Sequence, residues 1–299
     1  MRSLIDRHRV SGRFLILGSA SPDLIGQSSE SLAGRITYVE LTPFHILEIN
    51  NEDIDNLWIR GGFPEPFLCQ DDEIREEWHR SFISTYIERD LPMLGLNTSS
   101  LQLRKFLNML SGIQGSVLNI QMLSRSMGVS STTTIRYLDY LEKSFLIRRL
   151  PPFYINIKKR LVKSPKIYIR DTGIFHSLLD IITYKQLWDN IHLGASWGSF
   201  AIEQIITNKG QQLETWFYRT HEGTECDLLL TKNNIPVACI EMKITQAPKR
   251  TKSLTLAIND LKTKQNFIVV PKCDESFKIS EKIIVCSISQ FIRNYLPLL

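Results

Sequence analysis

The sequence predicts a mixed α/β protein, with both α/β and α+β segments. We expect several modules that follow one another without long linkers. Three observations lead to this prediction. Short apolar runs that suit strands alternate with amphipathic stretches that suit helices over the 299 residues. A helix-turn-helix rhythm occupies the middle of the chain. The last third shows the order helix, three strands, helix, strand.

The composition is that of an ordinary globular protein, with 43% hydrophobic and 22% charged residues. No apolar run approaches the roughly 18 residues that a membrane span needs, and the apolar stretch near the start is too short for a signal peptide. The five cysteines are scattered without CxxC spacing. This pattern is typical of a reducing compartment, so we expect a cytoplasmic protein with no membrane partner.

Residues 1–50 form the first predicted module. The apolar stretch 14–17 predicts a buried strand, and Pro22 opens a short helix after it. Residues 36–43 predict a second strand. Two strands separated by a helix make a parallel α/β fragment, but two strands do not form a stable sheet alone. We therefore expect this module to be the remnant of a larger domain.

Residues 51–97 predict a helical connector with an acidic composition. From residue 51 to residue 90, eleven acidic side chains face four arginines, which gives a net charge of −7. The Gly61-Gly62 pair predicts a turn. Residues 71–92 then predict one helix, whose acidic first turn suits the helix dipole and which ends at a proline.

Residues 98–169 predict a winged helix-turn-helix. A short helix, a turn at Gly128 and a cap at Ser130 or Ser131 lead into a second helix, and two strand-like runs follow around a basic turn. From residue 98 to residue 165, eleven basic side chains face two acidic ones, a net charge of +9 that favours an anionic partner. The residues that we expect to contact DNA or another nucleic acid are Thr132, Thr133, Arg136, Lys158, Lys159 and Arg160.

Residues 170–299 predict the last module, in which charged side chains interrupt apolar strands. Asp227 lies in the second of three predicted strands, and Glu241 and Lys243 occupy alternate positions of the third, on one face. Asp227 and Glu241 offer hard oxygen ligands for Mg²⁺ or Mn²⁺. Lys243 is placed to orient a water molecule or to stabilise the charge of a phosphate under attack. Glu203 lies in the helix that precedes these strands; the resemblance given next implies that it is a further metal ligand, directly or through water.

This order of elements, with Glu203, Asp227 and Glu241-Met242-Lys243, resembles the PD-(D/E)xK restriction-endonuclease-like fold. The resemblance implies metal-dependent phosphodiester hydrolysis, with Glu203, Asp227, Glu241 and Lys243 as the catalytic residues. The stretch LILGSASPDLIGQSSESLAGRITYVELTPF, together with the rest of the chain after it, resembles a prokaryotic AAA+-type P-loop ATPase family that carries a C-terminal domain of unknown function. In that resemblance Ser19 takes the sensor position, and Arg35 is a candidate arginine for the γ-phosphate or a subunit interface.

The chain departs from the ATPase family at the nucleotide site. It contains no GxxxxGK[ST] loop and no apolar strand that ends in the acidic pair associated with Mg²⁺. The backbone amides and lysine of that loop hold the phosphates, so we expect ATP binding only if another chain supplies the missing P-loop.

Three hypotheses remain open from the sequence. The first is a nucleic-acid-associated protein with a metal-dependent nuclease site. The second is a non-enzymatic regulatory or assembly module, in which the winged helix packs against proteins and Lys243 only forms an ion pair with Asp227 or Glu241. The third is an ATPase that is completed by another chain.

Overall fold

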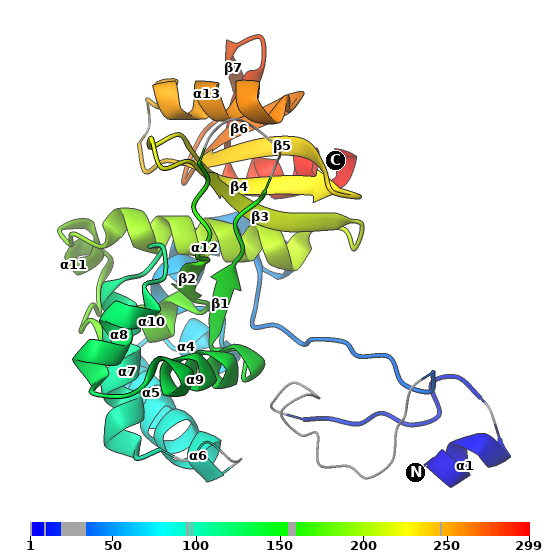
Figure 1. Ribbon diagram of the computed structural model, residues 1–299, viewed down its shortest axis with the longest axis vertical. Helices are drawn as coiled ribbons and strands as arrows, with labels where there is room; N and C mark the ends of the chain where they lie inside the picture. Colours follow the sequence, from blue (N-terminus) through cyan, green and yellow to red (C-terminus); the bar gives the residue numbers. More distant parts are fainter. Residues whose placement is uncertain are drawn as a thin grey trace.

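The computed structural model describes residues 2–8, 10–18, 34–93, 96, 98–154, 160–245 and 247–299. Within them the predicted mixed α/β class is confirmed, because helices pack around a six-stranded sheet and a two-stranded sheet (Figure 1). Three residues with predicted roles, Ser19, Lys158 and Lys159, lie outside the described residues. None of the described helices is long and apolar enough to cross a membrane.

The N-terminal residues lie to one side of the rest of the molecule (Figure 1). They begin with α1 (Arg2–Arg7). The strands predicted at 14–17 and 36–43 are not formed, and Leu15 and Val39 are each 87% exposed. A strand needs a neighbour to pair its backbone and cover its side chains, and no described strand pairs with these stretches. The prediction of two strands here was wrong.

The acidic connector is helical, as predicted. Its longest helix starts after Asp71, whose carboxylate accepts hydrogen bonds from the backbone N–H groups of Glu73 and Ile74. The helix runs on through a π-helical stretch and ends one residue after Pro92. The elements of this region are η1 (Ile46–Glu48), η2 (Asn51–Asp53), α3 (Ile54–Arg60), α4 (Pro64–Leu68), α5 (Asp72–Phe82), η3 (Ile83–Asp90) and α6 (Leu91–Met93).

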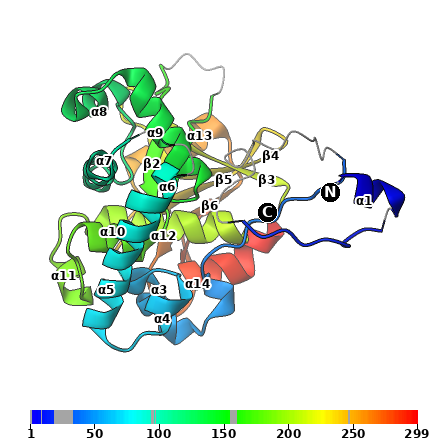
Figure 2. The ribbon, with the colours of Figure 1, turned by 90° about the horizontal axis from the view of Figure 1, so that it is seen from below.

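The winged helix-turn-helix is present where the sequence predicts it. Gly128 takes the left-handed conformation, with φ at 69°, that ends the first helix of the motif, and the Ser130 hydroxyl accepts from the N–H of Thr133 to cap the second. Figure 2 shows α7, α8 and α9 as one group beside β2. The elements are α7 (Ser100–Gly112), α8 (Ile120–Met127), α9 (Ser131–Lys143), β1 (Ile147–Leu150) and β2 (Lys166–Ile169).

The C-terminal part contains the predicted order of helix, three strands, helix and strand. Strands β3, β4 and β5 pair antiparallel, and β5, β6 and β8 pair parallel, in the sheet order β3-β4-β5-β6-β8-β7. The elements are α10 (Thr172–Leu178), α11 (Tyr184–Trp188), α12 (Leu193–Asn208), β3 (Leu213–Arg219), β4 (Glu225–Lys232), β5 (Ile235–Met242), α13 (Lys252–Leu261), β6 (Gln265–Val270), β7 (Phe277–Ser280), β8 (Ile283–Ser287), α14 (Ile288–Gln290), η4 (Phe291–Tyr295) and η5 (Leu296–Leu298).

The six-stranded sheet lies between α12 and α13 (Figure 1). Phe200 and Ile205 of α12 share one buried cluster with Leu228, while Leu254 of α13 shares another with Leu229, the next residue of β4. The first of these clusters also contains Ile46, Leu57 and Trp58 of the connector. A third cluster joins the connector to the winged helix and to α10. The apolar cores therefore cross the predicted module boundaries.

The long connection between β1 and β2 also contacts the large sheet. Its two arms pair with β3, because the N–H of Phe153 donates to the carbonyl of Phe217 at 2.8 Å and the N–H of Val162 donates to that of Arg219 at 3.0 Å. Strand β3 would otherwise present an open edge, which other chains could extend. These bonds fix the winged helix onto the C-terminal sheet.

Candidate functional site

Asp227 and Glu241 lie at the same end of two paired strands. Leu228 of β4 pairs with Ile240 of β5 in an antiparallel ladder. Asp227 precedes Leu228 and Glu241 follows Ile240, so these two residues are neighbours across the two strands. The Asp227 carboxylate accepts a hydrogen bond from the N–H of Met242 at 3.0 Å. The side chains of Asp227 and Glu241 are 30% and 11% exposed, so both are held by the protein. The structure therefore brings the two predicted metal ligands together.

Lys243 lies beside these carboxylates. Its Nζ is 2.9 Å from Oε1 of Glu241, and the hydroxyl of Thr251, at the start of α13, donates to Glu241 at 2.9 Å. Burial opposes the charge of Lys243, but the neighbouring carboxylates, chiefly Glu241 and then Asp227, raise the pKa of its ammonium above the ordinary value. Lys243 is therefore a cation at neutral pH, and its side chain is still 39% exposed.

A lysine of the winged helix reaches the same cluster. The Nζ of Lys166, in β2, lies 2.5 Å from Oε1 of Glu225 and 3.6 Å from Oδ1 of Asp227, and it sits over the ring of Phe217. The side chain is only 6% exposed. Burial opposes its charge, but the surrounding groups, Tyr168, Asp227 and Glu225, raise the pKa of Lys166. A buried cation thus binds the carboxylates of two residues on β4.

Glu203 lies in a different cluster. Arg148 of β1 donates to both of its oxygens, at 2.7 and 2.8 Å, and Arg170, just after β2, donates to one at 2.7 Å. Burial opposes ionisation of Glu203, but the two guanidinium groups lower its pKa to about 2. Arg170 also pairs with Glu40. Glu203 therefore joins the winged helix to α12, and its oxygens do not contact Asp227, Glu241 or Lys243.

The donor chemistry at Asp227 and Glu241 fits Mg²⁺ or Mn²⁺. Both residues offer carboxylate oxygens, and Mg²⁺ commonly binds through one or two carboxylates, with water and substrate phosphate completing the shell. No group of three or more His, Cys, Asp or Glu residues in the described part of the chain could hold a metal by itself. A divalent ion would therefore rest on this pair, and its remaining ligands would come from outside the described residues.

Carboxylates neutralise part of the positive charge of the winged helix. Arg104 pairs with Glu88, Arg148 with Glu203, and Arg149 with Asp139 at 2.7 Å. Glu88 and Glu203 lie outside residues 98–165, so they cancel part of the +9 charge that the sequence counts, whereas Asp139 is already included in that count. The exposed polar side chains on α8, α9 and the wing connection include Arg125, Thr132, Arg136, Lys143, Arg160 and Lys163. Thr133 is half-buried and bonds the Ser130 hydroxyl.

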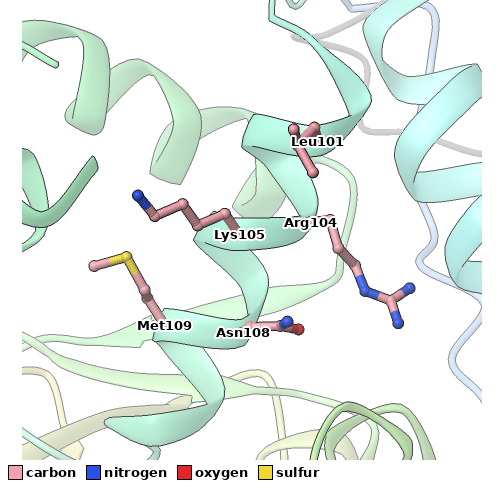
Figure 3. A pocket seen from close by; sticks show the side chains of 5 residues that line it. All are labelled: Leu101, Arg104, Lys105, Asn108 and Met109. Atoms are coloured by element: carbon pink, nitrogen blue, oxygen red, sulfur yellow. The ribbon is translucent and has the colours of Figure 1, made fainter. Parts of the chain in front are cut away.

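Helix α7 carries a separate shallow pocket on its outer face. Figure 3 shows its lining, in which Leu101, Lys105 and Met109 follow one another along the helix, with Arg104 and Asn108 beside them. The Lys105 ammonium donates to the backbone carbonyl of Ser126 at 3.0 Å, which ties this pocket to the end of α8. The walls come from one helix only, and the residues offer no carboxylate, thiol or histidine for chemistry.

The predicted nucleotide-contacting residues give no second site. Arg35 donates to both carboxylate oxygens of Asp6, at 2.8 and 3.2 Å, within the N-terminal segment. The other candidate, Ser19, is outside the described residues, as are Lys158 and Lys159 of the basic turn.

Three residues of the site were not predicted from the sequence. Lys166 was not singled out, because the strand that carries it is distant in sequence from β4. Glu225 could have been found, since it precedes Asp227 by two positions and alternate residues of a strand share a face. Thr251 has a local signal as well: it is the N-cap of α13, and its hydroxyl accepts from the N–H of Leu254.

Two family models match the chain. Residues 51–185 match a domain of unknown function, DUF8612, and residues 193–291 match a second, DUF4143. The uncharacterized protein Rv2008c of Mycobacterium tuberculosis is 38% identical over 98% of this chain and 66% of its own length. The uncharacterized protein MJ1544 of Methanocaldococcus jannaschii is 24% identical over 90% of this chain and 64% of its own. This chain thus spans about two thirds of these relatives, and no solved structure shows a significant match to it.

Proposed function

We propose that this chain, which contains two domains of unknown function, binds nucleic acid and hydrolyses phosphodiester bonds with a divalent metal ion. The observation that carries the proposal is the position of Asp227 and Glu241 beside the Leu228–Ile240 pair, with the Lys243 ammonium 2.9 Å from Glu241. Two carboxylates and a lysine at one end of a β-ladder are costly to desolvate, and they match the requirements of metal-assisted phosphate chemistry.

Each side chain has a defined role in this proposal. Asp227 and Glu241 would hold Mg²⁺ or Mn²⁺, which when bound polarises the phosphate and lowers the pKa of a bound water. Thr251 fixes the Glu241 carboxylate through its hydroxyl. Lys243, which keeps 39% of its side chain exposed, neutralises negative charge that develops on the phosphate. Glu203 has a positioning role, since it holds Arg148 and Arg170.

Changing Asp227 to Asn, or Lys243 to Met, is expected to reduce Mn²⁺-dependent cleavage of single-stranded or supercoiled DNA at least about 100-fold, because each removes a group that acts on the scissile phosphate. Gel assays of the purified full chain measure the rate. Glu214→Gln is the matched control, because Glu214 is an exposed carboxylate of the neighbouring strand that bonds Thr231 instead of the cluster. Cleavage that survives both changes would come from a contaminant and would contradict the proposal.

The second candidate is a non-enzymatic assembly or regulatory module, which the charge balance of the cluster favours. The three carboxylates of Glu225, Asp227 and Glu241 already face the cations of Lys166, Lys243 and, at 3.5 Å, Arg219. The formal charges of the cluster therefore balance without a metal ion. Absence of cleavage with every divalent ion, together with retained nucleic-acid or protein binding, would favour this candidate.

A third proposal is an ATP-dependent role, in an ATPase that another chain completes. It requires a P-loop from outside this sequence, with Ser19 and Arg35 meeting the nucleotide. Complex formation with a P-loop protein that depends on ATP would support it. The Arg35–Asp6 pair would then have to open.

Reversing the charge of Arg136 on α9 is expected to weaken binding to duplex DNA about tenfold at low salt, because the second helix of the motif is the element that enters a groove. Fluorescence anisotropy over a salt series measures the affinity and its salt dependence. Lys278→Glu on β7, an exposed lysine away from the winged helix, is the control for the change in net charge. Equal losses in the two variants would indicate a non-specific charge effect and would remove α9 from the interface.

A further inference from the structure

A pocket lies where the returning arm of the β1–β2 connection meets the β3–β4 turn. Its volume is about 610 Å³, and its polar lining includes Tyr154, Arg160, Lys163, Ser164 and His221. None of these residues belongs to the carboxylate cluster. Of them, only Arg160 is predicted from the sequence to contact nucleic acid.

Hydrogen bonds fix the shape of this pocket. The Tyr154 hydroxyl donates to the backbone carbonyl of Lys163 at 2.9 Å, so the ring lies across the two arms of the connection. The N–H of His221 donates to the carbonyl of Arg160 at 2.9 Å, and Leu161 forms an isolated bridge with Thr220. The walls thus come from two chain segments joined by a β-like pairing, which makes the pocket a built feature of the fold.

The side chains suit a nucleotide unit. Tyr154 is 54% exposed, so its aromatic side chain is accessible for stacking with a base. Neither Arg160 nor Lys163 forms an ion pair with a carboxylate in the described part of the chain, in contrast to Arg104, Arg148 and Arg149. Exposed cations beside an exposed aromatic ring are the two components of a single-strand binding surface.

The pocket adjoins the carboxylate cluster. Lys163 precedes Lys166 by three residues, and the Lys166 ammonium contacts Glu225. On the other wall, His221 precedes Glu225 by four residues. Since even a fully extended chain rises by only about 3.3 Å per residue, the three residues from Lys163 to Lys166 span at most about 10 Å, a distance that a few nucleotides of one strand cover.

We propose that this pocket binds one nucleotide of a single-stranded nucleic acid, with the base against Tyr154 and the phosphate beside Arg160 and Lys163, and directs a phosphodiester a few nucleotides further along the strand toward Asp227 and Glu241. The inference rests on the proposed function, and it adds the substrate class and the path of the strand. Duplex DNA held by α9 alone is the competing arrangement.

The test is anisotropy of a labelled deoxythymidine oligonucleotide with the full chain, in EDTA so that no cleavage occurs. Tyr154→Ala is expected to weaken binding about tenfold, since stacking on one aromatic side chain contributes about 1–3 kcal/mol per base. Tyr154→Phe keeps the ring, loses only the bond to Lys163, and should bind within about twofold of the unmodified protein. Lys163→Glu should weaken binding by a similar factor and reduce its salt dependence. The matched controls are Tyr38→Ala, at a tyrosine 63% exposed in the N-terminal segment, and Lys278→Glu.

The outcomes separate this inference from the proposed function. Oligonucleotide binding that is unchanged in Tyr154→Ala and Lys163→Glu, while Mn²⁺-dependent cleavage persists, would overturn the pocket and leave the proposed function in place. Equal losses in Tyr154→Ala and Tyr154→Phe would assign Tyr154 a structural role and also overturn the stacking. An unmodified protein that neither binds nor cleaves any nucleic acid would overturn both.

Discussion

Replacing Glu203 with glutamine is expected to lower the free energy of unfolding by about 3 kcal/mol, because Arg148 and Arg170 lose the anion that they share. The Glu203 side chain is 15% exposed, and the two guanidinium groups are 24% and 10% exposed. Burial disfavours the charged form of Glu203, yet the arginines lower its pKa from 4.5 to about 2, which corresponds to about 3 kcal/mol. Glutamine keeps the shape and removes only the charge.

Urea denaturation at pH 7 measures this effect. The matched control is Glu88→Gln, which removes the partner of Arg104, a residue with a 37% exposed side chain, and should cost less than about 1 kcal/mol. In the unmodified protein, the contribution of Glu203 is fully present above pH 4.5 and is lost as the pH falls toward 2, since the folded-state pKa is the lower one. If Glu203→Gln is as stable as Glu88→Gln but has lost cleavage, Glu203 belongs to the catalytic machinery after all.

The winged helix could be predicted in detail because its signals are local. The left-handed Gly128 and the capping hydroxyl of Ser130 act within one turn of the helices that they end or start. Local spacing was less successful for side-chain burial. Ile135 has the spacing of a buried residue but is 39% exposed, while Tyr137, two positions later, is 2% exposed. The face that a helix buries depends on its neighbours, which spacing alone does not specify.

Only the residues that strand alternation and pairing bring together could be predicted as members of the site. Asp227, Glu241 and Lys243 come together because alternation and antiparallel pairing act over a few residues. Glu203 was grouped with them through the family resemblance, but its partner Arg148 lies 55 residues away and reaches it through the packing of the winged helix on α12. Lys166 arrives at Asp227 in the same way. Long-range ion pairs of this kind leave no pattern in a single sequence.

Acidification from pH 6.5 to pH 4.5 is expected to destabilise the fold by up to about 5 kcal/mol, because two histidines are buried in the neutral form. One is His176, whose Nδ1 lies 3.0 Å from the carbonyl of Ile59 and whose Nε2 lies 2.7 Å from the Ser196 hydroxyl. The other is His79, whose Nε2 has no hydrogen-bond partner among the described residues. Burial is the main cause that lowers the pKa of each from 6.5 to about 4.

Stability falls on acidification because the pKa of each histidine is lower in the folded chain than in the unfolded chain. Above pH 6.5 neither the folded nor the unfolded chain protonates these rings, so their burial has no pH-dependent cost. As the pH falls below 6.5, the histidines of the unfolded chain become protonated while the buried rings of the folded chain stay neutral. Each histidine therefore reduces the free energy of unfolding by about 2–3 kcal/mol before its folded form titrates near pH 4. Glu203 contributes its own loss only below pH 4.5, so the decrease between pH 6.5 and pH 4.5 does not include it.

Two variants assign the loss to its source. His79→Leu replaces a buried ring nitrogen that lacks a partner with an apolar side chain, so it should remove about half of the decrease between pH 6.5 and pH 4.5 without lowering stability at pH 7.5. Glu203→Gln should lower the whole curve and leave the decrease in this window unchanged. Urea midpoints taken at half-unit pH steps give both results. A flat curve for the unmodified protein over this window would mean that water or a carboxylate reaches the two rings, and it would contradict their burial in the neutral form.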